Sequence, residues 1–506
     1  MSVSVDPTAL ALRPFGIADS AEMIRSWLLR ARWFGGKEHR VLRVELDDLG
    51  SIRTEDPTLL LTLWRVDYAE APTEVYSVPL GIRTAPHAVS ELGPDHLITA
   101  IRGIDGPLLV YDALADPETA AELWRLLATG TSTATSAGRL LVSRLTEIDS
   151  ETAELPHLLG VQQSNSALVR GQRDFLKWSR RIEAGPNAEL EMIEALASRG
   201  FRHIPALRAY LSYQRGGEPP ALQAILQDFL HNGTEGWAMA LTSLRDLYAA
   251  AEEAEVDSSR ERRELVDEQH ASFQGEAARL GEVTAELHLA LADPALPGWL
   301  APTRAGPALL DRWATQMISA LDGLLATDHP SVAPLRQKRE VVVARFEALR
   351  HLEDGGVAIR THGDYHLGQV LRTDDGWNVI DFGGEPARGA QERRELSSPL
   401  RDVAGMLRSF DYAAAAALAE RMQPSDPLWP RLLAAGHTWA NTNRDAFWAA
   451  YLERASGSGL LPEGGSSLTV LRAFELNKAV YEVGYELGHR PDWAGIPLSF
   501  LLAGVP

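Results

Sequence analysis

The chain has 506 residues, more than one ordinary hydrophobic core holds, so we expect two or three domains or lobes. Hydrophobic residues make up 45% and charged residues 23%, as in folded globular proteins. The formal charge of −20 argues against nucleic-acid and anionic-membrane partners, and the lack of cysteine excludes disulfides, thiolate zinc sites and thiol nucleophiles. The N-terminus lacks a signal-peptide pattern and no apolar run reaches the length of a membrane span, so we expect a cytoplasmic protein.

The first part of the chain, residues 1–110, predicts a small N-terminal cap subdomain. Residues 19–31 carry a helix start signal and apolar side chains at helical spacing. Strand-like runs follow at residues 40–50, 58–70 and 74–83. A helix followed by a small antiparallel sheet is a compact unit, and a further capped helix is expected to end at Gly130.

Residues 111–229 predict a small β-rich lobe. From Arg139 the hydrophobic pattern alternates with a period of two through three short strands, and a helix follows between Asn187 as N-cap and Gly200 as C-cap. Two more strands flank a Gly/Pro turn before residue 230. Five strands with one helix after the third are typical of the small lobe of a kinase-like fold.

Residues 230–506 predict a helical C-terminal lobe. The charge-rich run at residues 250–269 could indicate a coiled coil or a nucleic-acid contact, but mixed charges at helical spacing favour a solvated helix face. The overall expectation is therefore an α+β, two-lobed, protein-kinase-like fold with an N-terminal α/β cap.

The stretch THGDYHLGQV, residues 361–370, contains the strongest candidate site. Asp364 and Gln369 are five residues apart, and Asp381 follows after a short apolar strand. Phosphoryl transfer needs one carboxylate to orient the acceptor hydroxyl, and a carboxylate with an amide oxygen to hold Mg²⁺ against the nucleotide phosphates. The order and gaps repeat the catalytic-loop and D-F-G pattern of protein kinases, with Gln in place of Asn.

The same stretch allows simpler interpretations. His362 is expected to brace the loop backbone, and Asp364 alone could be a turn carboxylate. His362 and His366 are four residues apart, but they do not lie on the helix that a zinc-binding H-x-x-x-H pair requires.

A nucleotide site should add a cation and a cover for the phosphates. Lys177 lies in the third small-lobe strand, with Glu191 or Glu189 of the next helix as its expected partner. No G-x-G-x-x-G motif precedes it, so Ser164, Asn165 and Ser166 are the expected phosphate contacts. The junction segment that follows would read adenine and includes Gln227, Asp228 and Leu230.

The C-terminal two-thirds resembles an aminoglycoside-phosphotransferase-type kinase. HGDYHLGQVL and EPARGAQERRELSSPLRDVAGMLRSFDYAA are similar to stretches of bacterial maltokinases, and RWFGGKEHR is similar to the maltokinase N-terminal cap. The resemblance implies that Asp364 is the catalytic base, that Gln369 and Asp381 bind Mg²⁺, and that Lys177 holds the nucleotide phosphates.

Two departures resemble the maltokinase-related glucosamine kinases of actinobacteria. Gly383 replaces an acid in DFGGEP, and the segment GHTWANTNRDAFWAAY carries polar and aromatic side chains. An amino sugar needs an aromatic face, amides for hydroxyl groups and carboxylates for its ammonium. The candidate sugar contacts are His366, Asp411, Glu420, Trp439, Asn441, Asn443 and Arg444. Each also has a plain structural interpretation, and Asp402 is expected to brace the catalytic loop.

The expected function is therefore an ATP- and Mg²⁺-dependent sugar kinase that acts on glucosamine at the 6-hydroxyl, as a monomer or weak homodimer. Maltokinase activity is the alternative. An aminoglycoside kinase and a catalytically inactive nucleotide-binding regulator are less favoured, because the chain carries an elaborate cap and retains Lys177, Asp364 and Asp381. A protein kinase is disfavoured because HGD replaces HRD and no A-P-E segment is visible.

Overall fold

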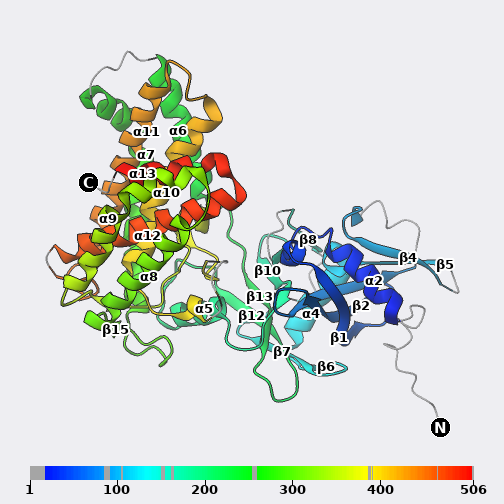
Figure 1. Ribbon diagram of the computed structural model, residues 1–506. Coiled ribbons are helices and arrows are strands. Elements are labelled where there is room, and N and C mark those ends of the chain that lie inside the picture. Colours follow the sequence, from blue (N-terminus) through cyan, green and yellow to red (C-terminus); the bar gives the residue numbers. More distant parts are fainter. Residues whose placement is uncertain are drawn as a thin grey trace, which may run out of the picture. The chain divides into compact units, whose positions relative to one another are not determined.

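The computed structural model describes residues 17–84, 92–103, 106–149, 154–160, 165–253, 259–385, 389, 391–463 and 465–503. The chain forms two compact units (Figure 1). Unit 1 comprises residues 1–187 and 205–231, and unit 2 comprises residues 188–204 and 232–506. The predicted cap and β-rich lobe therefore lie together in unit 1, whereas the helix between their strands belongs to the helical unit 2.

Unit 1 contains the expected cap sheet, in the order β1-β2-β3-β5-β4, with β11 pairing with β3. Its strands are β1 (Val41–Arg53), β2 (Thr58–Tyr68), β3 (Glu74–Arg83), β4 (Leu97–Gly103), β5 (Gly106–Asp112) and β11 (Arg181–Ile182). Helix α2 (Ile17–Leu28) covers one face through Trp27, which packs with Trp33 and strand side chains in a buried cluster. This face carries one of the hydrophobic cores in the described part of unit 1.

The second sheet of unit 1 has seven antiparallel strands in the order β6-β7-β12-β13-β10-β9-β8. They are β6 (Thr133–Ala134), β7 (Arg139–Arg144), β8 (Pro156–Leu158), β9 (Asn165–Arg170), β10 (Asp174–Ser179), β12 (Leu207–Gln214) and β13 (Ala221–Asp228). Trp124 of α4 (Pro117–Thr129) lies with residues of both sheets in one buried cluster, so the cap and the small lobe share a core.

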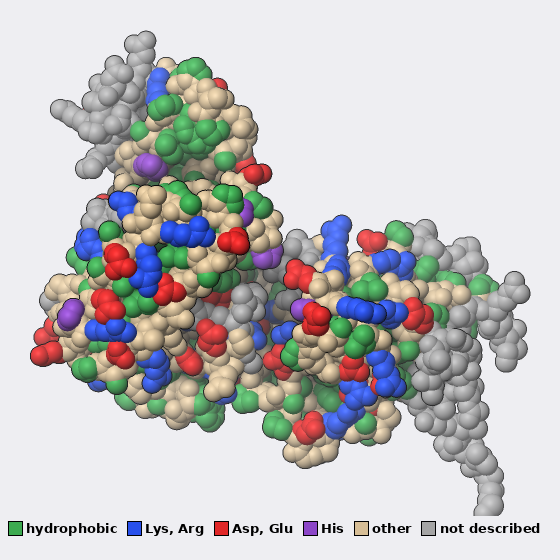
Figure 2. Space-filling model, viewed as in Figure 1, with side chains coloured by type: hydrophobic (Ala, Val, Ile, Leu, Met, Phe, Trp, Pro, Cys, Tyr) green, Lys and Arg blue, Asp and Glu red, His purple; other side chains and the backbone are tan. Residues whose placement is uncertain are grey.

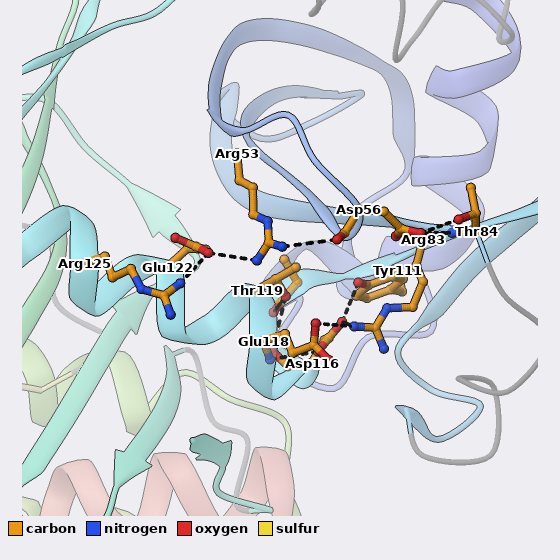
Figure 3. A network of polar contacts seen from close by, with 11 residues as sticks. Arg53, Asp56, Arg83, Thr84, Tyr111, Asp116, Glu118, Thr119, Glu122 and Arg125 are labelled. Atoms are coloured by element: carbon orange, nitrogen blue, oxygen red, sulfur yellow. Dashed lines mark hydrogen bonds and ion pairs between the residues drawn. The ribbon is translucent and has the colours of Figure 1, made fainter. Parts of the chain in front are cut away.

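Helix α4 is fixed to the cap by polar contacts at its N-terminal end (Figure 3). Asp116 caps the helix by accepting from the backbone N–H of Glu118 at 2.9 Å, and the same side chain accepts from the Tyr111 hydroxyl. Glu122, two turns further, accepts from Arg53 of β1 at 2.9 Å. As expected, α4 ends at Gly130, whose φ of 64° suits a residue without a side chain.

Unit 2 is built from long helices that pack on one another (Figure 1). They are α5 (Ala188–Ser198), α6 (Gly236–Glu253), α7 (Ser259–Leu291), α8 (Pro307–Leu325), α9 (Ala333–Glu347), α10 (Leu400–Arg421), α11 (Trp429–Ala455), α12 (Ser466–His489) and α13 (Gly495–Ala503). Helices α7 and α11 pack along each other, and α10 contacts both α11 and α12. Residues 367–369 of the stretch that carries the candidate site contact α6 and α10.

Two short sheets position that stretch in unit 2. One contains β14 (Thr234–Glu235), β17 (Val370–Thr373) and β18 (Gly376–Val379), and the other pairs β15 (Thr303–Arg304) with β16 (Val357–Ala358). Of the described residues just before His362, Val357 and Ala358 pair as a regular strand, and Ile359 adds a single bridge to Ser397.

Acidic and basic side chains are interspersed over the face shown in Figure 2. No helix of the described ranges is long and apolar enough to cross a membrane.

Candidate active site

The predicted catalytic loop, residues 361–370, is held by a buried carboxylate from helix α10. Asp402, in the first turn of α10, accepts from the backbone N–H groups of His362 at 2.7 Å and Gly363 at 2.9 Å. Its Oδ2 also lies 3.3 Å from Nε2 of His288 on α7. Burial would raise the pKa of Asp402, but the hydrogen bond and charge of His288 and the backbone hydrogen bond lower it. The prediction that Asp402 braces this loop is confirmed.

His362 links the loop to the following strand. Its Nε2 contacts the carbonyl oxygen of Ile380 at 2.9 Å, and its ring packs against Tyr365 and Phe382. The side chain is almost fully buried. His362 therefore braces the backbone, as predicted. The residue that it contacts, Ile380, directly precedes Asp381.

Gln369 and Asp381 lie at adjacent ends of β17 and β18. The two strands pair with Val370 opposite Val379, and the N–H of Ile380 donates to the carbonyl oxygen of Gln369 at 3.0 Å. Asp381 comes one residue later with a φ of 61°, a left-handed conformation that turns the chain sharply. A carboxylate and an amide oxygen at neighbouring strand ends are a donor set that suits Mg²⁺. That these two residues bind Mg²⁺ stays a prediction.

Asp364 lies between a lysine and a histidine. Lys478 of α12 donates to its Oδ1 at 3.3 Å, and Nε2 of His366 lies 3.8 Å from its Oδ2. Burial would raise the pKa of Asp364, but the charge and hydrogen bond of Lys478, together with the neighbouring His366 and His362, keep the pKa below its usual value. The group is therefore an ionised carboxylate at neutral pH, as a proton acceptor must be.

The protonation of His366 follows from its contacts. Its Nδ1 accepts from the N–H of Gly368 at 3.0 Å, and burial lowers its pKa to about 4. The ring is therefore neutral at pH 7, with its proton on Nε2, toward Asp364.

Lys478 is a site residue that the sequence reasoning missed. It also donates to Glu385 at 3.1 Å, and its Nζ lies 4.8 Å from the centre of the Tyr481 ring. Lysine is rare in this chain, with only Lys37, Lys177, Lys338 and Lys478 among 49 basic residues. That scarcity was a usable signal, because 45 of the 49 basic residues are arginines and a lysine is therefore the exception.

One face of the second sheet of unit 1 carries three of the predicted nucleotide contacts. Lys177 of β10 lies opposite Ala167 and Ile225, while Asn165 lies opposite Ser179. Gln227 lies opposite Phe175. Because side chains alternate along a strand and paired residues share a face, Lys177, Asn165 and Gln227 lie on the same side of the sheet.

Of the other residues predicted to contact the nucleotide, those that the structure describes do not share this sheet face. Ser166 is wrong as a phosphate contact, because it lies on the opposite, buried face and accepts from Nε of Arg180 at 2.8 Å. Ser164 lies outside the described residues. The backbone N–H groups of Asp228 and Phe229 donate to the carbonyl oxygens of Ala206 and Arg173. These two donors are therefore already satisfied within the protein. Leu230 follows directly and is half-buried.

Glu191 has arginine partners inside unit 2. It accepts from Nε and Nη2 of Arg394 at 2.9 and 2.7 Å, and Arg360 lies 3.6 Å away. Its predicted pairing with Lys177, a residue of unit 1, stays a prediction.

The predicted sugar contacts lie in different parts of unit 2, with His366 beside Asp364 and the others in three groups. Arg444 of α11 donates to Asp411 at 2.9 Å and to Glu475 of α12, while Arg408 donates to Glu482 at 2.8 Å and lies 3.5 Å from Asp411. Asp411 and Arg444 are thus brought together on a charged face formed by α10, α11 and α12. Lys478 lies on α12 between Glu475 and Glu482, so this face continues to Asp364.

Other sugar predictions are wrong for this structure. Trp439 is fully buried, donates to Ser243 at 3.0 Å and packs against Phe273, so its ring has no face for a sugar. Asn443 is buried and donates to the carbonyl oxygen of Trp439. Helical spacing alone did not reveal that both face the core of unit 2.

The two remaining candidates lie at the surface. Glu420, near the C-terminal end of α10, pairs with Arg245 of α6 at 3.2 Å, and both side chains are exposed. Asn441 is also exposed. Neither has a contact with the catalytic loop among those described, so their role in sugar binding stays a prediction.

Comparison with known families agrees with this architecture. Residues 27–116 match the maltokinase N-terminal cap domain, and residues 183–435, half of the chain, match the phosphotransferase enzyme family. These matches confirm the two-lobed kinase fold with its cap.

Comparison with individual proteins shows which branch of the phosphotransferase family this chain resembles. The chain is 30% identical over 356 residues to a glucosamine kinase of Mycolicibacterium smegmatis, covering 70% of this chain and 80% of that protein. It is 29% identical to a glucosamine kinase of Streptacidiphilus jiangxiensis, covering 67% and 70%. A solved glucosamine kinase in complex with glucosamine, ADP and inorganic phosphate has the same fold, with a TM-score of 0.63, 24% identity and coverage of 92% and 94%. The chain therefore belongs to the phosphotransferase enzyme family and, within it, to the glucosamine kinases.

Proposed function

We propose that this protein transfers the γ-phosphoryl group of ATP to the 6-hydroxyl of D-glucosamine. The observation that carries the proposal is Asp364, an ionised carboxylate on a braced loop that leads into the short hairpin whose two ends carry Gln369 and Asp381. This is the set of groups that phosphoryl transfer to an alcohol requires.

In the proposed reaction, Asp364 accepts the proton of the sugar hydroxyl as its oxygen bonds to the γ-phosphorus. The bond from that phosphorus to the bridging oxygen of ADP breaks, and ADP leaves with the electron pair. Gln369 and Asp381 would hold Mg²⁺, which neutralises phosphate charge when bound. Lys177, with Asn165 on the same sheet face, would contact the donor phosphates.

The charge of the α10–α12 face favours an amino sugar over a neutral one. The connected side chains around Lys478 comprise five carboxylates and four cations, which leaves an excess of one negative charge: Asp364, Glu385, Asp411, Glu475 and Glu482 with Lys478, Arg401, Arg408 and Arg444. The excess of negative charge attracts an ammonium group. Maltokinase activity is the second candidate, because the cap matches the maltokinase N-terminal domain.

The test is ATP consumption with Mg²⁺ in the presence of glucosamine, N-acetylglucosamine, glucose, maltose or kanamycin. We expect glucosamine to dominate, and ³¹P–¹³C NMR of the product to place the phosphate on C6. Asp364→Ala should lower kcat by roughly 100- to 10,000-fold, to a small residual rate, with an unchanged thermal melt. Turnover dominated by maltose would assign the second candidate, and a folded, fully active Asp364→Ala protein would refute the proposed mechanism.

A further inference from the structure

Lys478 is the residue nearest to the proposed base whose role the family assignment leaves open. Its Nζ donates to Oδ1 of Asp364 at 3.3 Å and to Oε1 of Glu385 at 3.1 Å. Glu385 is nearly fully buried, whereas about one fifth of the Lys478 side chain is exposed. The ammonium group therefore bridges two carboxylates that would otherwise repel each other.

The position of Lys478 is set by the helix that carries it. Glu475, one turn before it on α12, pairs with Arg444 of α11, and Glu482, one turn after it, pairs with Arg408 of α10. Both neighbours on the same helix face are thus anchored to other helices. The Lys478 stem projects from a fixed segment, so its ammonium group can act as a fixed point for the catalytic loop.

Lys478 also remains charged despite its partial burial. Burial would lower its pKa, but Glu385, Asp364 and Glu482 raise it above its ordinary value. A permanent cation at Oδ1 fixes the plane of the Asp364 carboxylate. Oδ2 is then the oxygen available to the acceptor hydroxyl, with the neutral His366 ring 3.8 Å away.

We propose that Lys478 is a positioning residue that holds Oδ1 of Asp364 and thereby directs Oδ2 toward the acceptor hydroxyl. This inference rests on the proposed function in assigning Asp364 as the base. It predicts that Lys478 acts on turnover through Asp364 and not through a contact of its own with the nucleotide.

The experiment compares Lys478→Met, Lys478→Arg and the control Lys338→Met, which removes an exposed lysine on α9 of the same unit. A positioned base accelerates reactions by about 100- to 10,000-fold, so losing its orientation should lower kcat of Lys478→Met by roughly 100-fold. The KM for ATP should change by less than about threefold. Lys478→Arg should recover part of the loss, and Lys338→Met should match the wild type.

A double variant separates positioning from direct contact. Because Lys478 acts through Asp364, adding Lys478→Met to Asp364→Ala should cause no further loss of the residual turnover. Additive losses, or a Lys478→Met protein with nearly wild-type kcat, would overturn the inference.

A crystal structure of Lys478→Met gives a readout that does not depend on the substrate. We expect the Asp364 carboxylate to rotate away from its wild-type orientation or to occupy two conformers. An unchanged, singly ordered Asp364 would contradict the positioning role. Failure of the wild type to phosphorylate any sugar would instead refute the proposed function, while this structural comparison still tests Lys478.

Discussion

Replacing Asp402 by Asn tests how the catalytic loop is held. The carboxylate receives two backbone N–H groups of the loop, at 2.7 and 2.9 Å, and faces His288 at 3.3 Å. Asn has the same shape but only one acceptor oxygen, so its amide must face one of these donors. At least one buried N–H then loses its partner.

The cost can be worked out from these contacts. An unsatisfied buried N–H costs about 1–3 kcal/mol, and exchanging a charged acceptor for a neutral one weakens the remaining bond by about 1 kcal/mol. We therefore expect Asp402→Asn to lower the free energy of unfolding of unit 2 by about 2–4 kcal/mol. Displacing the loop by about 1 Å should also lower kcat by roughly 100-fold.

The assay is urea denaturation monitored by tryptophan fluorescence, combined with steady-state turnover. Asp322→Asn is the matched control, since Asp322 pairs with Arg339 at the surface of the same unit, where an ion pair contributes about 0–1 kcal/mol. An Asp402→Asn protein within about 0.5 kcal/mol of the wild type, with full turnover, would refute the bracing argument.

Three other predictions follow from the same structure. Arg180→Met should lower the free energy of unfolding of unit 1 by about 3–5 kcal/mol, because it leaves the buried Asp112 carboxylate unpaired; a melt like that of the wild type would contradict this. Chelation by EDTA should stop turnover and added Mg²⁺ should restore it, whereas Asp381→Asn should keep the wild-type melt and not respond to Mg²⁺; an Asp381→Asn protein with normal Mg²⁺ dependence would remove Asp381 from the metal site. Since burial lowers the pKa of His366 to about 4, the unfolded chain takes up a proton below about pH 6.5 that the folded protein does not bind, so the free energy of unfolding should fall between pH 6.5 and 4. Denaturation curves across this range should show a weaker pH dependence for His366→Gln, and identical slopes would contradict the assignment.

The elements of the fold were predictable where local patterns determine them. The strands of the cap and small lobe follow a period of two between turn residues, and α4 ends at Gly130 as expected. The candidate site could be predicted as a cluster because Asp364, Gln369 and Asp381 lie within one loop and one hairpin, while their catalytic and metal-binding roles stay predictions. Spacing along the sequence is then close to spacing in the molecule.

The wrong or missing predictions concern which face of a strand or helix a side chain lies on, and contacts between residues far apart in the sequence. Ser166 shares the buried face of β9 with Leu168, and alternation along the strand could have revealed this. Trp439 lies on a helix whose spacing does not distinguish a ligand-binding face from a core face, so only the packing with α6 and α7 decided its place. Lys478 reaches Asp364 across 114 positions of sequence, and no local pattern encodes such a contact.

The residues that position the proposed base, Asp364, all lie within unit 2. Asp402, His288, His366 and Lys478, which fix the loop and the carboxylate, all belong to this unit, as do Gln369 and Asp381. Preorganised groups of this kind lower the barrier to reaction without a conformational cost at the moment of transfer. Lys177 and Asn165, by contrast, belong to unit 1. Substitutions around Asp364 should therefore lower kcat at nearly constant affinity for ATP, whereas substitution of Lys177 should weaken ATP binding and leave the geometry of Asp364 intact.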